Sequence, residues 1–177
     1  MEVIKPNLQK AVDAVKDGKV LVCPTDTVYG LICDADNKKA VEKIYKIKNR
    51  PKNKFLPIFV RDIEMAKKLV EINSKQEEFL KKVWPGAVTV VIEKKRSALR
   101  IPNNKFLINL IKRVGPLAET SANISGEPST AKIKEVLKYF NGRKYQPDLI
   151  LDGGNLKSVK PSQVIDISGS CPVTLRR

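Results

Sequence analysis

The stretch KVLVCPTDTVYGL, residues 19–31, joins an apolar run to a segment rich in hydroxyl groups. The apolar half is typical of a buried strand, and the polar half begins where that strand ends. Side chains of an extended chain alternate between two faces, so Thr25, Thr27 and Tyr29 would lie on one side if the strand continued. Three hydroxyls on one side suit a small polar ligand, although the same pattern also fits a solvated strand end.

Helical and strand patterns alternate along the rest of the chain. Apolar residues at helical spacing predict helices over residues 7–18, 37–51, 62–71, 74–86, 105–115 and 130–140. Apolar or alternating runs predict strands over residues 19–24, 55–60, 87–94, 98–102, at the start of 117–129, and over 148–154, 163–168 and 173–177. No repeat or linker interrupts this order. We therefore predict one α/β domain over residues 1–177, with a twisted mixed sheet and flanking helices.

Local signals mark several element ends. Asn7 is typical of a helix N-cap, Ser74 and Glu77 have the spacing of a capping box, and Thr130 suits the cap of the last helix. Pro57 interrupts the strand pattern at 55–60. Because proline lacks a backbone N–H, this strand is expected at a sheet edge or at a distortion.

The composition excludes several classes of protein. The 177 residues include no histidine, which excludes Ser-His-Asp and Cys-His catalysis and any zinc site with histidine ligands. The cysteines Cys23, Cys33 and Cys171 match no CxxC pattern, so we expect reduced thiols. No apolar run approaches the length of a membrane span, and the first residues lack the apolar core of a signal peptide. We therefore expect a soluble, cytoplasmic protein.

The chain is strongly basic, with 34 Lys and Arg residues against 19 Asp and Glu residues and a net charge of +15. Such an excess favours polyanionic partners, including nucleotides, RNA and anionic lipid. Lysine enrichment of the kind found in some thermophiles is an alternative explanation. Arg100 lies in the apolar segment LRIP, where its guanidinium either extends into water or binds a carboxylate.

Two polar segments are suited to anion binding. Lys48 and Arg50 lie where a predicted helix breaks against Pro51, so their charges could converge on phosphates. Ser121 and Asn123 lie in a loop of small residues that can donate hydrogen bonds to an anion. Each segment also fits a solvated helix end or turn. The chain contains neither GxxxxGK[ST] nor GxGxxG, so a nucleotide would not be held by a P-loop or a Rossmann turn.

The order of these segments resembles the YrdC family. PTDTVYGL, KIKNRP, WPGAVTVVI, LRIP, GPLAETSANISGEPS, DLILDGG and PSQVIDIS occur in that order, and the resemblance runs from about residue 8 to the C-terminus. It implies a single-domain YrdC-like fold with a basic concave surface. It also implies L-threonylcarbamoyladenylate synthase activity, in which L-threonine, bicarbonate and ATP give threonylcarbamoyl-AMP and pyrophosphate. The carbamoyl group then goes to the adenosine beside the tRNA anticodon, with partner proteins such as the KEOPS complex.

The resemblance also assigns candidate site residues. Lys48 and Arg50 match the K-x-R element of the family, where they are expected to act in catalysis by neutralising phosphates. Ser121 and Asn123 match the S-x-N element. Both elements line the pocket for ATP and threonine in the family.

Four further positions follow from the same resemblance. Thr27 matches a threonine-contacting position, and Arg100 matches the arginine expected to hold the threonine carboxylate. Ser162 and Arg176 match positions that meet ATP. Magnesium would be held mainly by the ATP phosphates, as is usual for this ion, and no protein ligand is nominated for it.

The chain departs from the family pattern at three positions. Ile32 stands where the family often has glycine, and Gln163 stands where it usually has threonine. Phe59 stands where many members have a histidine, which removes one possible contact to threonine. The chain matches the short, single-domain form of the family.

Two other functions stay open. A basic α/β domain without catalytic activity would bind double-stranded or structured RNA, including tRNA, through its phosphates. A carbamoyl-handling role in hydrogenase maturation is a third reading, although no zinc-finger or acylphosphatase segment is found. Pyrophosphate release that requires threonine and bicarbonate would distinguish a synthase from an RNA-binding protein, whose affinity for RNA would fall steeply with salt.

Overall fold

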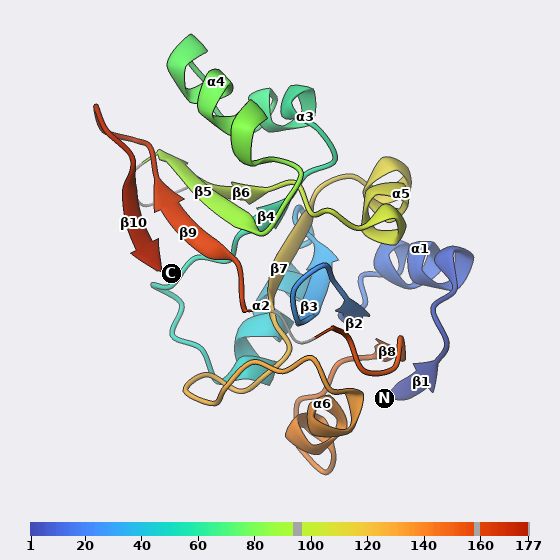
Figure 1. Ribbon diagram of the computed structural model, residues 1–177. Coiled ribbons are helices and arrows are strands. Elements are labelled where there is room, and N and C mark those ends of the chain that lie inside the picture. The colour runs from blue at the N-terminus through green and yellow to red at the C-terminus, as the bar shows by residue number, and fades with distance from the viewer. Residues whose placement is uncertain (94–96, 158–159, 177) are drawn as a thin grey trace.

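The computed structural model describes residues 1–93, 97–157 and 160–176, and the described strands form one mixed sheet (Figure 1). The strands are β1 (Glu2–Ile4), β2 (Leu21–Pro24), β3 (Tyr29–Asp34), β4 (Ile58–Phe59), β5 (Val88–Glu93), β6 (Ser97–Arg100), β7 (Leu117–Ser121), β8 (Leu149–Leu151), β9 (Gln163–Asp166) and β10 (Val173–Arg176). Along the sheet their order is β1-β8-β2-β3-β7-β4-β6-β5-β9-β10. Parallel and antiparallel pairs both occur, which confirms the predicted mixed sheet.

Helices cover both faces of this sheet. They are α1 (Leu8–Lys16), α2 (Lys38–Lys48), α3 (Ile63–Lys67), α4 (Ser74–Val83), α5 (Lys105–Val114) and α6 (Ile133–Phe140). Helices α1 and α5 pack on one face around Leu21 and Leu117, whereas α2 and α6 pack on the other face around Val22 and Ile150. Because neighbouring residues of β2 are buried on opposite faces, this strand reads as a continuous apolar run in the sequence.

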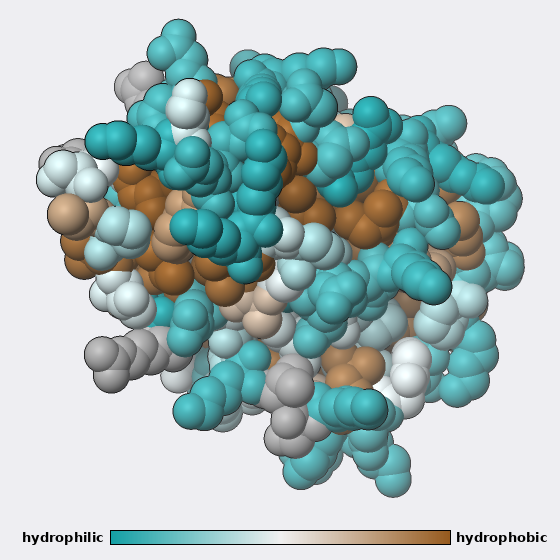
Figure 2. Space-filling model, turned by 45° about the horizontal axis from the view of Figure 1, so that its top comes forward, coloured by the Kyte–Doolittle hydropathy of each residue, from teal (hydrophilic) through white to brown (hydrophobic). Residues whose placement is uncertain are grey.

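A third apolar cluster lies at the other end of the sheet, where α3 and α4 pack on β5 and β6 (Figure 1). Beyond it, β9 and β10 end the sheet, and Val173 and Leu175 of β10 are 56% and 59% exposed. Hydrophobic side chains gather toward this end on the left of the space-filling view (Figure 2). The part of the sheet between the two groups of helices is left free for a cavity.

The opening stretch does not continue as one strand. The chain turns after β2 and returns as β3, so that Cys23 pairs with Gly30. Thr25 closes the turn, because its hydroxyl donates to the Val28 carbonyl at 2.7 Å and accepts from the Thr27 N–H at 3.0 Å. Strand β3 was missed in the sequence because this turn carries none of the usual glycine pairs of a hairpin.

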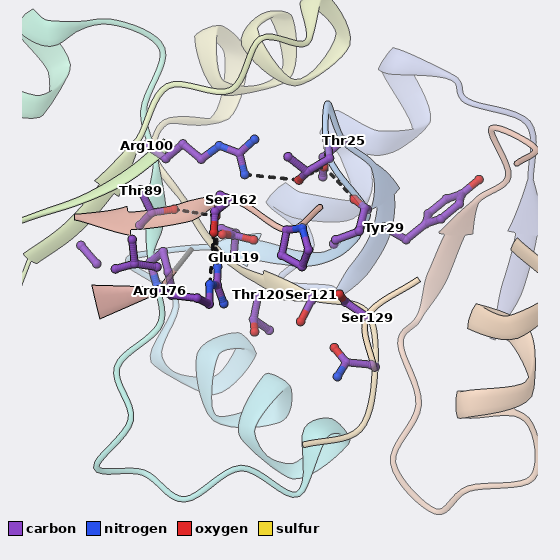
Figure 3. A pocket seen from close by; sticks show the side chains of 18 of the residues that line it. Thr25, Tyr29, Thr89, Arg100, Glu119, Thr120, Ser121, Ser129, Ser162 and Arg176 are labelled. Atoms are coloured by element: carbon purple, nitrogen blue, oxygen red, sulfur yellow. Dashed lines mark hydrogen bonds between the residues drawn. The ribbon is translucent and has the colours of Figure 1, made fainter. Parts of the chain in front are cut away.

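The turn also separates the three hydroxyls that the sequence placed on one side. The Thr25 and Thr27 hydroxyl oxygens lie 3.0 Å apart, which agrees with that prediction. The Tyr29 hydroxyl instead donates to the Gly154 carbonyl at 2.6 Å and points away from the other two (Figure 3). The shared face was predicted only for a continuous strand, and because the chain turns it does not include Tyr29.

Of the two alternatives predicted from Pro57, a sheet edge or a distortion, the edge position was wrong. Strand β4 lies inside the sheet, between β7 and β6. Pro57 precedes β4, and its carbonyl accepts a hydrogen bond from the Glu119 N–H at 2.8 Å. The proline is tolerated because it contributes only its carbonyl to the ladder.

The helix caps are confirmed in one case out of three. The Asn7 side chain accepts from the Lys10 N–H, as predicted. The capping box of α4 is formed by Asn73 and Gln76, one residue before the predicted pair. Helix α6 begins after Lys132 without a side-chain cap; Thr130 instead accepts from the Lys132 N–H at 3.0 Å, and its hydroxyl donates to Glu135.

Some predicted bounds lie beyond what is described. Lys94 and Arg177, at the predicted ends of two strands, lie outside the described residues. The short strand β1 was not predicted, because three residues carry too little pattern. None of the described helices is long and apolar enough to cross a membrane.

Candidate active site

A cavity of 420 Å³ opens on the free part of the sheet, between the β2–β3 turn, the loop after β7 and the β9–β10 end. Its volume lies in the usual range of small-molecule sites. Seven of the eight residues proposed from the sequence line it, and several are labelled in Figure 3: Thr27, Arg50, Arg100, Ser121, Asn123, Ser162 and Arg176. Lys48 is the one that does not line it.

Arg100 is fixed in place before any ligand arrives. It is 2% exposed, and its guanidinium forms an ion pair with Asp26 at 2.7 Å. It also donates to the Gly86 carbonyl at 2.9 Å and to the Thr27 hydroxyl at 3.4 Å. A buried charge requires such partners, so Asp26, which sequence reasoning did not single out, orients Arg100 toward the cavity.

Phe59 packs against the same guanidinium, with its ring centre 5.6 Å from the Arg100 carbon. Phe59 and Ile32 are fully buried in the cluster under α1 and α5, and neither lines the cavity. Two of the three departures from the family pattern are therefore core residues here. The third, Gln163, is an exposed residue at the start of β9.

Lys48 lies behind the cavity wall. Its side chain is buried, and its amine donates to the Ser121 carbonyl at 2.5 Å, to the Asn123 carbonyl at 2.8 Å and to the Asn123 side-chain oxygen at 3.1 Å. Burial, with a smaller contribution from Arg50, lowers the pKa of Lys48 to about 7. The amine thus ties the end of α2 to the loop after β7, and the predicted contact between Lys48 and ATP stays a prediction.

Asn123 has a similar structural use. Its amide nitrogen donates to the carbonyls of Ile124 and Glu127, at 3.0 Å and 2.5 Å. Its side-chain oxygen accepts from Lys48. Within the described ranges the hydroxyl of Ser121 has no such partner, so Ser121 is the member of the S-x-N element that is free to bind a ligand.

Arg50 reaches the cavity because of the way α2 ends. Asn49 has a left-handed backbone, with φ of 51°, which turns the chain sharply after the helix. The Arg50 guanidinium then donates to the Lys54 and Phe55 carbonyls, both at 3.0 Å. The guanidinium is held at the cavity wall by these backbone contacts.

The far wall is formed by the last strands. The Thr89 and Ser162 hydroxyl oxygens lie 3.0 Å apart, and Arg176 donates to the Ser162 carbonyl at 2.8 Å. Figure 3 shows these three side chains together. Thr89 was missed, since alternation in AVTVVIEK alone does not say which face of β5 meets a ligand.

Glu119 is a further lining residue that sequence reasoning missed. It is 9% exposed, and burial raises its pKa, while Arg100, Arg176 and Lys48 oppose that shift. Its carboxylate forms no hydrogen bond or ion pair within the described part of the chain. Across residues 1–93, 97–157 and 160–176, no group of three or more Asp, Glu, Cys or His side chains is placed to hold a metal ion.

The comparisons with known proteins agree with this architecture. The putative threonylcarbamoyl-AMP synthase of Methanocaldococcus jannaschii is 35% identical over 92% of this chain and 81% of its own length. The threonylcarbamoyl-AMP synthase of Bacillus subtilis is 33% identical over 97% of this chain, which spans only 53% of that relative. The structure of Pyrococcus abyssi Sua5 complexed with L-threonine superimposes with a TM-score of 0.88 at 31% identity, covering 99% of this chain and 56% of that one.

A protein-family model also matches most of the chain. The Sua5/YciO/YrdC model, described as "Telomere recombination", matches residues 13–177. The match includes every lining residue discussed above. The chain therefore belongs to the Sua5/YciO/YrdC family.

Proposed function

We propose that this chain is a threonylcarbamoyl-AMP synthase, which joins L-threonine, bicarbonate and ATP and releases pyrophosphate. The observation that carries the proposal is the convergence of three arginines and several hydroxyls on one cavity. Relatives that bear this activity in their names match the chain over most of its length.

The threonine end of the cavity is proposed to be the corner formed by Arg100 and Thr27. Asp26 and the Gly86 carbonyl hold the Arg100 guanidinium in one orientation. A preorganised arginine binds a carboxylate at low entropic cost. The P. abyssi neighbour was solved with L-threonine, which supports an amino acid as the ligand.

The nucleotide is proposed to lie toward Arg50, Ser121 and Arg176. The carboxylate of N-carboxythreonine attacks the α-phosphorus of ATP, and pyrophosphate leaves. Charge builds on the phosphate oxygens in that step, so fixed arginines stabilise its transition state. Lys48 and Asn123 position the Ser121 loop from behind.

Magnesium is proposed to enter with ATP, held mainly by the phosphates and by water. The ion prefers oxygen ligands, and hydroxyl oxygens such as that of Ser129 line the cavity. The donor set of the cavity therefore fits a phosphate-bound Mg²⁺. Its chemistry would be to neutralise charge on the leaving pyrophosphate.

The test is pyrophosphate release from ATP with Mg²⁺ and bicarbonate, scanning the twenty amino acids one at a time. Release with threonine alone supports the proposal. No release with any amino acid, or equal release with all, contradicts it. The product would be handed to a KEOPS-like transfer complex that modifies tRNA, which predicts a cytoplasmic location.

RNA binding is a second candidate, because a basic groove adjoins the cavity. It is lined by Tyr45, Lys46, Ile47, Asn49, Arg50, Lys52, Arg143, Lys144 and Tyr145. Lys46 and Lys144 lie 5.9 and 5.6 Å from the ring centre of Tyr145, and Arg50 lines both the groove and the cavity. Titration with tRNA at several salt concentrations tests this: binding through phosphates weakens steeply with salt, and an affinity that does not change with salt refutes it.

A further inference from the structure

Glu119 is the buried carboxylate that the proposed reaction leaves without a role. It lies in the middle of β7, at 9% exposure, and it lines the cavity. A carboxylate that lines a cavity has fewer water contacts than an exposed one, and this partial desolvation is costly when no protein group is its partner. Such carboxylates are found most often at functional sites, where a ligand can supply the missing partner.

The backbone explains why this side chain meets the cavity. Leu117, Glu119 and Ser121 lie on one face of β7, because side chains of a strand alternate. Leu117 is covered by α1 and α5, whereas Glu119 and Ser121 lie beyond these helices. The same face of β7 therefore belongs to the core at Leu117 and to the cavity wall at Glu119.

The space beside the carboxylate is kept open by a glycine. A side-chain carbon built on Gly30 would lie 3.8 Å from Glu119 Oε2 and 3.2 Å from the Thr25 methyl group. Any side chain at position 30 would therefore fill the approach to the carboxylate. The missing side chain leaves room for a small group of the ligand.

The surrounding charges define what that group is. Arg100 from β6, Arg176 from β10 and Lys48 from α2 act on Glu119 as positive charges, and Asp26 acts as a negative one. In Figure 3 Glu119 lies between Arg100 and Arg176. Both arginines, however, are hydrogen-bonded elsewhere, Arg100 to Asp26 and Arg176 to Ser162. The carboxylate has positive potential around it, but no cation among the described residues contacts it.

An α-amino acid fits this arrangement, since it carries a carboxylate and an ammonium group on one carbon. We propose that Glu119 binds the α-ammonium group of the amino acid whose carboxylate lies at Arg100, and accepts a proton from it during carbamate formation. This rests on the proposed function, and it deepens it by assigning a catalytic base.

The proton balance defines the step. The ammonium group gives one proton to Glu119, and the freed nitrogen lone pair attacks the carbon of bicarbonate. The N–C bond forms, and the C–OH bond breaks as the second amine proton joins the leaving hydroxide, giving water. The products are the carbamate anion, water and protonated Glu119, which returns its proton to solvent. Burial raises the pKa of Glu119, which makes it a stronger base than an exposed glutamate.

The test compares Glu119→Gln with Glu127→Gln, an exposed carboxylate at the cavity rim that serves as the matched control. Calorimetry without ATP measures affinity for L-threonine and for 2,3-dihydroxybutanoate, in which a hydroxyl replaces the amine. Glu119→Gln is expected to weaken threonine binding about 30-fold or more, as for other buried charge pairs, and to leave the hydroxy-acid unchanged. Glu127→Gln is expected to bind both ligands as the wild type does.

Kinetics then separate the base from a purely structural role. Wild-type turnover should fall at acidic pH as Glu119 becomes protonated, and the Glu119→Gln variant should have a lower kcat and lack this acidic limb. Unchanged threonine affinity and turnover in a folded Glu119→Gln variant would overturn the inference, as would loss of ATP affinity alone. If Glu119→Gln does not fold, Glu119→Asp, which keeps the charge but shortens the reach, must lower kcat for the inference to stand. One outcome separates this inference from the proposed function. If threonine binding depends on Glu119 but the wild type releases no pyrophosphate, the proposed function is contradicted and the ammonium site stands.

Discussion

Lys48 offers the sharpest test of how the site is held together. The variant Lys48→Met keeps an unbranched apolar chain as far as Cε and removes the amine that donates to the Ser121 and Asn123 carbonyls. Burial lowers the folded-state pKa of this amine from 10.5 to about 7. Between these two values the unfolded chain binds more protons than the folded chain, so stability rises with pH in this window.

The size of the effect follows from the two pKa values. With the folded pKa at about 7, linkage gives the wild type about 2 kcal/mol more stability at pH 8.5 than at pH 6.5 from this group. For a chain of 177 residues that corresponds to roughly 4–8 °C in Tm. Lys48→Met should lack this gain, and its Tm should change less between the two values of pH.

The assay is urea or thermal unfolding of both proteins at pH 6.5 and 8.5. Comparing the two proteins at each pH cancels the effects of buried groups that titrate higher, such as Cys33 and Tyr29, whose pKa values are raised to about 12. Equal pH dependence in wild type and variant would refute the depressed pKa of Lys48. Turnover of Lys48→Met should fall by roughly 100-fold, because the loop that carries Ser121 loses its anchor.

The remaining predictions concern the cavity wall and the metal. Arg100→Met should destabilise the fold by about 2–4 kcal/mol, because the mostly buried Asp26 loses its ion pair and keeps only the hydrogen bond from the Asn103 N–H. The double variant with Asp26→Asn should regain part of this loss in urea unfolding, and no recovery would contradict the pairing. Ser121→Ala should weaken ATP binding about tenfold, measured by calorimetry, with little change in Tm. Asn123→Ala should lower Tm in thermal unfolding, because the Ile124 and Glu127 carbonyls lose their donor. The opposite pattern would reverse these two roles. Chelation of Mg²⁺ should stop pyrophosphate release and leave threonine binding intact, and a loss of threonine binding would place the metal at the amino acid.

The helices were predictable because their pattern is local. Apolar spacing alone identifies α1 and α5, and Asn7 marks the start of α1. The turn at Thr25 and the interior place of β4 depend instead on contacts between distant segments. The hairpin is closed by a threonine hydroxyl, and Pro57 is accommodated by Glu119 of another strand.

The cavity was predictable in part for the same reason. Arg50 and Ser121 stand out by residue type and by resemblance to a family. Asp26 and Glu119 do not, because their importance comes from what lies across from them: Arg100 in one case and the space beside Gly30 in the other. Lys48 was expected in the pocket, yet whether a lysine faces a ligand or a loop carbonyl depends on a loop 73 residues away.

The contacts of the cavity join distant parts of the chain. The Thr89–Ser162, Arg100–Asp26 and Lys48–Asn123 contacts span 73, 74 and 75 residues. Contacts of such range are made late in folding, so a partly folded chain has no complete binding surface. A bound substrate consequently stabilises the whole native state. At a free concentration one hundred times its Kd, it raises the free energy of unfolding by about 2.7 kcal/mol. Resistance to proteolysis should then rise together in segments as far apart as the β2–β3 turn and β10.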